Sequence, residues 1–462
     1  MVAITLFVYL LLLLGIGVWA QSRVRDTSDF HLAGRRMGPV VAALSASASS
    51  SSAWTLLGTS GAAYAWGLQA VWLIPAILLG FVINWVFIAP RLQAASRASQ
   101  ALTLVEFLAQ GTPVSTERRL RGLGAAIILF CFTFYVAAQF QAAGTAISTA
   151  LPVEASMAMV IGAGIVIVYV FLGGFWAASV TDSVQGLMML GVATVLPVVA
   201  LVSVGGPTGL WSGLIALDEP ALLRLVDQPS LFLAMVFVAG LFGIGIGYPG
   251  QPHVVNRFMA MSSSDQVAKA RMISLSWATV IYVGMIVLGL SGRVLLPELG
   301  DAESVLLRLS TDFLPAVVGG VVTGGVLAAI MSTADSQLLV AGSAVSHDMQ
   351  TRQHSLHTDR AVIIILGIAA VVLALYFPAS IFNRVLFAWQ VLGNAFGPLL
   401  IVLLFVGPVR PHHRLAAMLS GAALTIAISF FPQAPGNAVE RLLPFVVALT
   451  IAWSGASQSK HH

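Results

Sequence analysis

Two stretches of the sequence concentrate hydroxyl groups in apolar surroundings. Residues 45–52 read SASASSSS, with serine at six of eight positions, and residues 324–339 read GGVLAAIMSTADSQLL. In the second stretch, one helix face at positions i, i+3, i+4 and i+7 holds Ala329, Ser332, Thr333 and Ser336. Serine competes for backbone hydrogen bonds, so we expect the first stretch to unwind and expose carbonyl oxygens. Hydroxyl and carbonyl oxygens without a carboxylate suit a hard monovalent cation.

A packing role is the alternative for the serines. Small residues let membrane helices approach closely, and a serine hydroxyl can bond back to a carbonyl of the preceding turn. That role explains one or two serines, whereas six in eight residues favour a broken helix. Non-helical backbone at membrane depth is tolerated where it is buried in protein or lines a cavity. The serine stretch is therefore a candidate binding site.

Two carboxylates lie well inside apolar runs, where an ionisable group is costly and needs a partner. Asp335 lies beside the polar face of residues 324–339, and a bound cation could be its partner. The alternative is a carboxylate that caps or bonds a neighbouring helix. Asp182, in ASVTDSVQGLMML, lies near the expected start of its helix. There a carboxylate also suits the positive end of the helix dipole.

A third stretch, GIGIGYPGQPHVVNRFM at residues 243–259, is rich in glycine and proline. These residues predict a break or distortion at the cytoplasmic end of an apolar run. Tyr248 offers an aromatic face and a hydroxyl there. A simple kink without a binding role is the alternative.

The composition identifies the elements that must position these groups. Hydrophobic residues make up 58% of the 462 residues and charged residues 9%, which indicates a polytopic membrane protein. We predict thirteen spans, with 17 of the 22 lysines and arginines, Arg257 among them, in cytoplasmic loops. This asymmetry places the N-terminus outside and the C-terminus in the cytoplasm. The spans lie at about 2–20, 38–62, 67–90, 122–150, 155–174, 178–204, 230–250, 270–292, 315–346, 361–378, 382–407, 412–431 and 437–455.

The serine-rich and glycine-rich segments are the second and seventh spans. Interrupted segments at corresponding positions of two halves are typical of inverted-repeat transporters. We therefore predict one transporter domain with repeats at 38–204 and 230–407, an extra first helix at 2–20 and two extra helices at 412–455. The sequence lacks a Walker A motif and a long soluble loop, which argues against an ATP-driven pump, and we expect no enzymatic activity.

At this point the sequence resembles the sodium:solute symporter family, and within it the sodium/proline symporters. The resemblance rests on these stretches: DFHLAGRRMGPVVAALSASASSSSAW (29–54), FLGGFWAASVTDSVQ (171–185), GYPGQPHVVNRFMAM (247–261), LAAIMSTADSQLLVAGSAVSHD (327–348) and FAWQVLGNAFGP (387–398). It implies an all-helical fold like that of the leucine transporter, with two inverted five-helix repeats, and a bacterial inner-membrane location. It also implies Na⁺ as the coupling ion, held between the second and ninth spans.

The resemblance also implies the site residues. The main sodium site would use the carbonyl groups of Ala48, Ser51 and Ala329 and the hydroxyls of Ser332 and Thr333. A second sodium site would use Asp182, Asp335 and Ser336 together with Ser332. The expected solute-binding residues are Ser49, Ser52, Trp54, Tyr135, Tyr248 and Gln251.

The expected function is sodium-coupled import of a small organic solute, L-proline, across the lipid bilayer by alternating access. The expected partners are the solute and sodium, with no nucleic acid and no obligatory protein partner. Two departures from the proline-symporter pattern leave other cargoes open: Ile244 replaces a tryptophan and Ser50 an aspartate. Those cargoes are another amino acid, a betaine-like solute or a monocarboxylate. Proton coupling through Asp182 or Asp335, and a membrane sensor or channel-like protein without coupled transport, are further alternatives.

Overall fold

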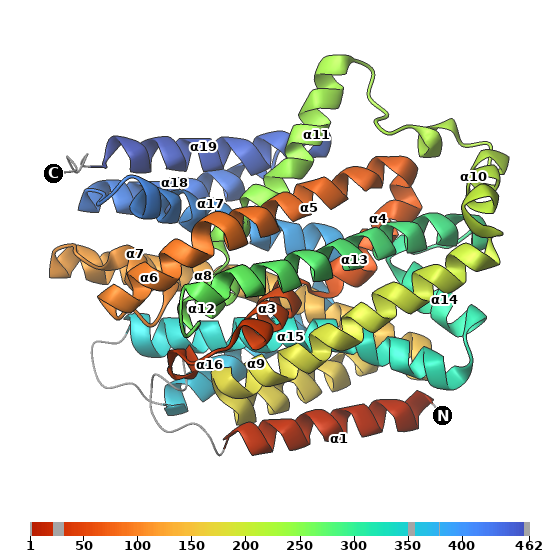
Figure 1. The fold of residues 1–462 in the computed structure, drawn as a ribbon, viewed down its shortest axis with the longest axis horizontal. Coiled ribbons are helices and arrows are strands. Elements are labelled where there is room, and N and C mark those ends of the chain that lie inside the picture. Colours follow the sequence, from red (N-terminus) through yellow and green to blue (C-terminus); the bar gives the residue numbers. More distant parts are fainter. Residues whose placement is uncertain (1, 22–31, 350–355, 378, 457–462) are drawn as a thin grey trace.

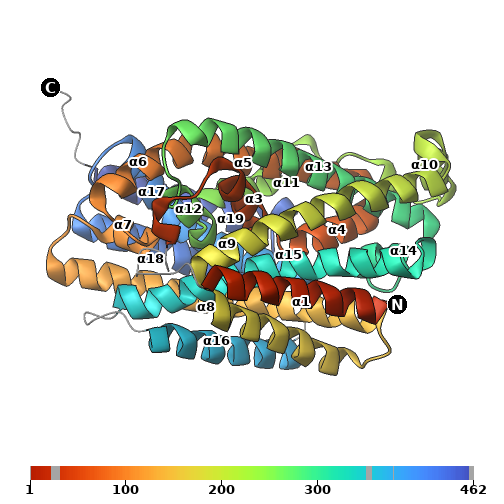
Figure 2. The ribbon, with the colours of Figure 1, turned by 60° about the horizontal axis from the view of Figure 1, so that its bottom comes forward.

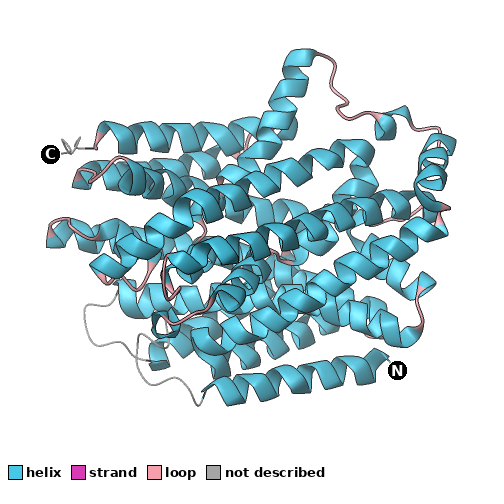
Figure 3. Ribbon diagram, in the orientation of Figure 1, coloured by secondary structure: helices cyan, strands magenta, loops and turns pink. Residues whose placement is uncertain are grey.

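The computed structural model describes residues 2–21, 32–349, 356–377 and 379–456. The regular elements of these residues are helices (Figure 3), as the backbone requires in hydrocarbon. The predicted all-helical class is confirmed. The α-helices are α1 (Val2–Gln21), α3 (Pro39–Ser50), α4 (Thr59–Trp66), α5 (Leu73–Val82), α6 (Ala89–Ser99), α7 (Leu104–Ala109), α8 (Val114–Ala150), α9 (Ala155–Ser203), α10 (Gly206–Ala216), α11 (Leu231–Ile246), α12 (Pro252–Met259), α13 (Asp265–Leu295), α14 (Val305–Phe313), α15 (Ala316–Ser343), α16 (Leu356–Tyr376), α17 (Ile381–Phe405), α18 (Pro411–Ile428) and α19 (Ala438–Ser454).

Nine helical segments of the described residues are long and apolar enough to cross a membrane. Helices α1, α3 and α18 and the first part of α9 fall outside these nine. The count of thirteen spans therefore stays a prediction, as does the division into repeats at 38–204 and 230–407.

Helix α9 joins two of the predicted spans, 155–174 and 178–204, into one continuous element of 49 residues. A straight helix of that length would measure about 74 Å, more than twice the hydrocarbon thickness of about 30 Å. Figure 2 shows its olive first part and its yellow second part as two arms of a V. The two predicted spans are therefore joined by a bend within one helix, and the crossing of the first arm, which falls outside the nine segments, stays a prediction.

Both predicted helix breaks are present. Helix α3 ends at Ser50, Ser51 and Ser52 lie outside any helix, and a short π-helix begins at Trp54. Helix α11 ends at Ile246, and the break lies at the end of the apolar segment Leu231–Gly250, where the glycine and proline residues predict it. Pro252 starts a new helix, α12, because proline fits the first turn of a helix, where its missing N–H is not needed.

Helices α3 and α12 lie against each other and are joined at the ends that lie away from the two breaks. The backbone N–H of Met37, just before α3, donates to the carbonyl oxygen of Ala260 at 3.2 Å. The N–H of Ser262 returns a bond to the Met37 carbonyl, also at 3.2 Å. Figure 1 shows α12 beside α3 in the middle of the molecule. The start of α3 and the end of α12 are thus tied together through backbone atoms.

Helix α15 is the central helix of the bundle. From Gly319 to Ser343 almost every residue is buried, and α15 packs against α1, α3, α8, α9 and α16. A helix that is buried all round cannot turn a polar face to water. The hydroxyl face predicted for residues 324–339 must therefore contact other protein groups or a ligand.

Helices α5 and α11 approach each other so closely that only glycine fits between them. A Cβ atom on Gly245 would lie 2.1 Å from the carbonyl oxygen of Ala76. A Cβ atom on Gly80 would lie 2.2 Å from the ring of Tyr248. Glycine is the residue that permits such approach of two backbones in membrane helices. The glycine-rich stretch thus fixes α11, and the Tyr248 ring after it, onto α5.

Candidate functional site

The hydroxyl face of α15 points at the broken end of α3. The Ser332 hydroxyl donates to the carbonyl oxygens of Ala48 and Ala329, both at 3.2 Å. The Thr333 hydroxyl donates to the carbonyl oxygen of Ser49 at 3.1 Å. All these residues are fully buried. Two ligands at right angles around a cation with bonds of about 2.4 Å lie about 3.4 Å apart, so this spacing suits a shared cation.

The structure brings four of the five residues expected at the main sodium site into these contacts. The fifth, Ser51, follows directly, and its N–H donates to the Ala48 carbonyl oxygen at 3.1 Å. Within the described residues neither α15 hydroxyl bonds to the Ser51 carbonyl oxygen. The Ser49 carbonyl takes that place at Thr333, which the sequence did not predict. Ser50 turns its hydroxyl back to the Ser47 carbonyl oxygen at 3.0 Å.

A buried ion pair lies one turn of α15 away from Ser332, beside Ser336. Arg257 Nη2 lies 3.0 Å from Asp182 Oδ2, and both side chains are fully buried. Ser45 and Ser49 donate to the same carboxylate oxygen at 2.7 and 3.1 Å. Arg257 also donates to the hydroxyls of Ser45 (3.2 Å) and Ser336 (2.5 Å). This network connects α3, α9, α12 and α15.

The assignment of Arg257 to a cytoplasmic loop is wrong. It lies in α12, and its side chain is fully buried. Asp182 lies 75 positions earlier in the chain, so no local pattern connects the two charges. The available signal was a buried carboxylate that needed a partner of opposite charge.

The second expected sodium site is only partly gathered around one point. Ser336 bonds to the Ser332 carbonyl oxygen at 2.9 Å, to the Ser49 hydroxyl at 3.0 Å and to Asp335 Oδ1 at 3.1 Å. Asp335 is 1% exposed, and its Oδ2 atom lacks a hydrogen-bond partner in the described structure. Asp182 and Ser336 share the Arg257 guanidinium. The positive charge of Arg257 therefore already lies at two of the expected ligands.

Most of the expected solute-binding residues surround the two breaks. The Tyr135 hydroxyl donates to the Ser52 hydroxyl at 3.4 Å, across the break of α3. Gln251 Nε2 bonds to the carbonyl oxygens of Gly247 (3.1 Å) and Trp389 (2.9 Å). The Tyr248 ring lies 4.6 Å from the Trp389 ring. Ser49 is the exception, because its hydroxyl belongs to the ion-pair network.

Buried polar atoms without a hydrogen-bond partner collect in the same place. Buried polar groups in proteins are normally bonded, so each exception calls for an explanation. His253 is fully buried, and among the described residues neither of its ring nitrogens has a hydrogen-bond partner. It was not among the expected solute-binding residues, although it lies two positions after Gln251. The other atoms of this kind near the breaks are Ser51 Oγ, Trp54 Nε1, Gln139 Nε2 and Gln251 Oε1.

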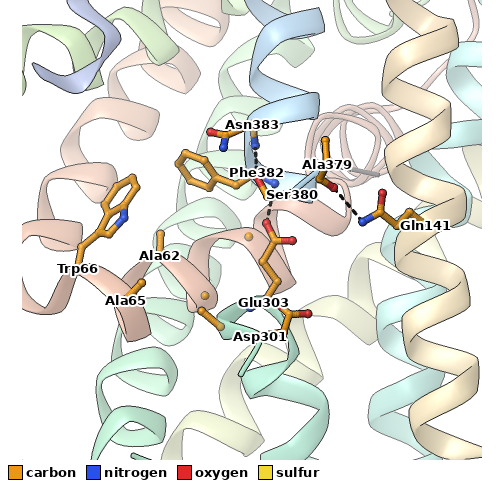
Figure 4. Close-up of a pocket in the computed structure, with 13 residues that line it drawn as sticks. Ala62, Ala65, Trp66, Gln141, Asp301, Glu303, Ala379, Ser380, Phe382 and Asn383 are labelled. Atoms are coloured by element: carbon orange, nitrogen blue, oxygen red, sulfur yellow. Dashed lines mark hydrogen bonds between the residues drawn. The ribbon is translucent and has the colours of Figure 1, made fainter. Parts of the chain in front are cut away.

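A cavity of about 550 Å³, here called the vestibule, lies toward the end of the bundle that holds α4 and α14 (Figure 4). Residues from 58–66, 301–303 and 379–383 line it, together with Gln141. Phe382 separates it from the breaks, since its ring lies 5.4 Å from the ring of Trp54 and 5.2 Å from that of Trp66. The vestibule therefore leads toward the predicted solute site and ends at an aromatic barrier.

Glu303 fastens the loop over the vestibule to α17. Its two carboxylate oxygens accept the backbone N–H groups of Ile381 (2.9 Å) and Phe382 (2.7 Å), as Figure 4 shows for Phe382. A carboxylate at a helix N-terminus is favoured by the helix dipole. Burial nevertheless raises the pKa of Glu303 above its ordinary value, and the nearby Asp301 adds to this rise. The sequence analysis assigned the acidic residues of this loop no role.

We expect the vestibule to become less accessible as the pH falls. The pKa of Glu303 is higher when the side chain is buried against α17 than when it is open to water, so proton uptake favours the closed arrangement. The effect should develop between neutral pH and the ordinary glutamate pKa of about 4.3. It can be measured as the rate at which a thiol reagent modifies Ala62→Cys in the vestibule wall.

The Glu303→Gln variant is the control, since its side chain does not titrate. The labelling rate of Ala62→Cys is divided by its rate in the Glu303→Gln background. This ratio removes the intrinsic pH dependence of the thiol. The native Cys131 is buried and does not compete for the reagent. A ratio that stays constant across the pH range would show that Glu303 does not control access.

Comparisons with known proteins agree with this geometry. Residues 30–421 match the sodium:solute symporter family. The chain is 32% identical to the high-affinity proline transporter PutP of Bacillus subtilis (strain 168). This match covers 94% of this chain and 95% of the relative. It is also 32% identical to the sodium/proline symporter of Staphylococcus aureus (strain JH9), with 92% and 85% covered.

A solved structure of a Na⁺-coupled sialic acid symporter, in a substrate-bound outward-open state, superposes with a TM-score of 0.81. It is 17% identical and covers 99% of each chain, so it shows a shared fold. The predicted leucine-transporter-like class is thereby confirmed. The length of the sequence match and the shared fold lead to one conclusion: this chain is a member of the sodium:solute symporter family.

Proposed function

We propose that the protein is a sodium-coupled symporter that imports L-proline. The observation that carries this proposal is the fully buried set of carbonyl oxygens at the break of α3, faced by the Ser332 and Thr333 hydroxyls of α15. Oxygen atoms without a carboxylate provide the ligands that a hard monovalent cation prefers. The names of the relatives, which match almost the whole chain at 32% identity, support proline as the cargo.

The main sodium site would consist of three parts. Helix α3 would supply the carbonyl oxygen of Ala48, the break after it the carbonyl oxygen of Ser51, and α15 the carbonyl of Ala329 and the hydroxyls of Ser332 and Thr333. The Ser49 carbonyl is a further ligand candidate because it already contacts Thr333. A hydroxyl keeps two lone pairs beside its proton, so each can bind a cation by rotating.

A second sodium ion would bind chiefly at Asp335. Its Oδ2 atom lacks a partner, whereas Asp182 and Ser336 already contact Arg257. Asp335 and Ser332 would be the principal ligands of that ion. Asp182 would act on Asp335 indirectly, through the hydroxyls of Ser49 and Ser336 that connect the two carboxylates.

Sodium at the main site would join α3 to α15 and thereby favour one arrangement of the broken helices. A solute that needs that arrangement gains affinity, and by reciprocity it raises the affinity for sodium. With the N-terminus outside, the vestibule would face the external medium and Phe382 would separate it from the solute. Inward movement of one charge is worth about 2.3 kcal/mol per 100 mV, and a tenfold sodium gradient adds about 1.4 kcal/mol.

The solute would lie between the two breaks. Ser52, Trp54, Tyr135, Tyr248 and Gln251 line this region, and His253 is an additional candidate because both ring nitrogens lack a partner. The indole of Trp389 can take the place of the tryptophan that proline symporters carry where this chain has Ile244. Its Nε1 donates to the Ile244 carbonyl oxygen at 3.0 Å and its ring packs on Tyr248. An indole thus lies beside the break even though position 244 lacks one.

Sodium-driven uptake into proteoliposomes tests the proposal. We expect L-proline to accumulate when an inward sodium gradient is imposed, and to stop accumulating when potassium replaces sodium. Uptake that persists without sodium but follows an imposed pH gradient would instead indicate proton coupling through Asp182 or Asp335. Competition by unlabelled amino acids, betaines and monocarboxylates identifies the cargo. Flux without accumulation against a gradient would indicate a channel, and no flux of any solute would leave the sensor hypothesis.

A further inference from the structure

A second cavity, of about 290 Å³, lies between α17, α18 and α19, on the other side of Asn383 from the vestibule. Two residues of opposite charge, Glu440 and Arg441, both line this cavity. They are 6% and 5% exposed. The cavity is thus separate from the α3 and α15 site and holds one carboxylate and one guanidinium.

Neither charge has an ion-pair partner in the part of the chain that the structure describes. The Glu440 carboxylate accepts a hydrogen bond from Asn437 Nδ2 at 3.2 Å. Arg441 Nη1 donates to the Gly240 carbonyl oxygen at 3.1 Å. Charged side chains are almost never buried unless they are paired. These two groups lie next to each other in the chain and face one cavity without pairing to each other.

The neutral part of the cavity wall is also polar. Gln390 is 1% exposed, and its Oε1 atom has no hydrogen-bond partner among the residues that the structure describes. Asn383, Ser429 and Asn437 contribute further polar side chains. The cavity therefore combines a site for a cation, a site for an anion and an unused acceptor, at a volume near the lower end for ligand pockets.

We propose that this cavity binds a small zwitterion, with the anionic group at Arg441 and the cationic nitrogen at Glu440. Such a group would pair both buried charges at once, and a bidentate guanidinium is well suited to a carboxylate or phosphate. Two sources share this chemistry: a free amino acid or betaine, and the headgroup of a zwitterionic lipid. The proposal does not depend on which solute the protein imports, because no residue of the expected sodium and solute sites lines this cavity.

Thermal unfolding of the full-length protein without sodium tests the proposal. Modification of the buried Cys131 by a thiol-reactive dye reports unfolding. We use nanodiscs of phosphatidylglycerol or phosphatidylethanolamine, with L-proline or glycine betaine as the soluble probes. A saturable rise in Tm with either probe in phosphatidylglycerol supports a free solute. A higher Tm in phosphatidylethanolamine, without a response to the probes, supports a lipid headgroup.

The variants connect these shifts to the cavity. Glu440→Gln should remove whichever shift is found, and Ser429→Phe should do the same by filling the cavity from its wall. Glu298→Gln, which removes an exposed carboxylate elsewhere, should leave the shift unchanged. Thr333→Ala should also leave it unchanged, which separates this cavity from the proposed sodium site. The proposal is overturned if neither source shifts Tm, or if the shift survives in both Glu440→Gln and Ser429→Phe.

Discussion

Replacing Thr333 or Ser332 with alanine should strongly weaken sodium-driven uptake while the protein still folds. Each substitution removes one hydroxyl from the proposed ion site and leaves the α3 carbonyl groups in place. Loss of one hydrogen-bonding group to a charged partner costs about 1.5–3 kcal/mol. We therefore expect the sodium concentration for half-maximal uptake to rise roughly 10- to 150-fold. Uptake as a function of sodium in proteoliposomes measures this change.

Two other serines serve as matched controls. Ser343→Ala removes a buried hydroxyl of the same helix that donates to the Leu339 carbonyl oxygen, at 2.7 Å. Ser51→Ala changes a residue expected to act through its carbonyl, and within the described residues its buried hydroxyl bonds to none of the other proposed ion ligands. Each should change apparent sodium affinity by less than about 0.5 kcal/mol, roughly twofold. If Ser51→Ala weakened sodium as much as Thr333→Ala, the side chain rather than the backbone of the break would bind the ion.

Breaking the Asp182–Arg257 ion pair should have the largest effect on stability. Arg257→Gln leaves the Asp182 carboxylate buried without its counter-charge, and removal of one partner of a buried pair costs about 3–5 kcal/mol. We expect a marked fall in Tm, measured by modification of Cys131 on unfolding. The double variant Asp182→Asn/Arg257→Gln leaves no buried charge and should recover much of the loss.

The exposed pair Arg224–Asp227, with its atoms 2.5 Å apart, provides the control. Surface ion pairs contribute about 0–1 kcal/mol, so Arg224→Gln should change Tm little. Arg257→Gln that is as stable as the unchanged protein would contradict the prediction, because Asp182 would then have to be neutral in the bundle. A double variant that is no better than the single one would show that the hydrogen bonds around the pair matter more than the charge.

The polar face of α15 and the break of α3 could be predicted because both depend on local chemistry. Helical spacing placed Ser332, Thr333 and Ser336 on one face, and repeated serine indicated where a helix would end. Periodicity does not say which faces meet, so the Arg257–Asp182 pair was missed. The Glu303 contact with α17 was missed for the same reason, since its partners lie 78 and 79 residues away.

The expected sites were predicted less completely than the fold. The solute set gathers around the two breaks, but Ser49 bonds instead to Asp182 and Ser336, and His253 was not foreseen. The orientation of the Ser49 hydroxyl depends on neighbours from two other helices, α9 and α15. The span count depended on hydropathy and on the distribution of lysine and arginine, and neither distinguishes a short loop from the bend inside α9.

The glycine contact between α5 and α11 constrains how this molecule can move. No side chain separates Gly245 from the Ala76 carbonyl, and Gly80 lies under the Tyr248 ring. Closely packed interfaces change between discrete arrangements and do not deform gradually. Helices α5 and α11 must therefore tilt together as one rigid unit that carries Tyr248 with it. A displacement of either helix is then also a displacement of the wall against which the solute is expected to bind.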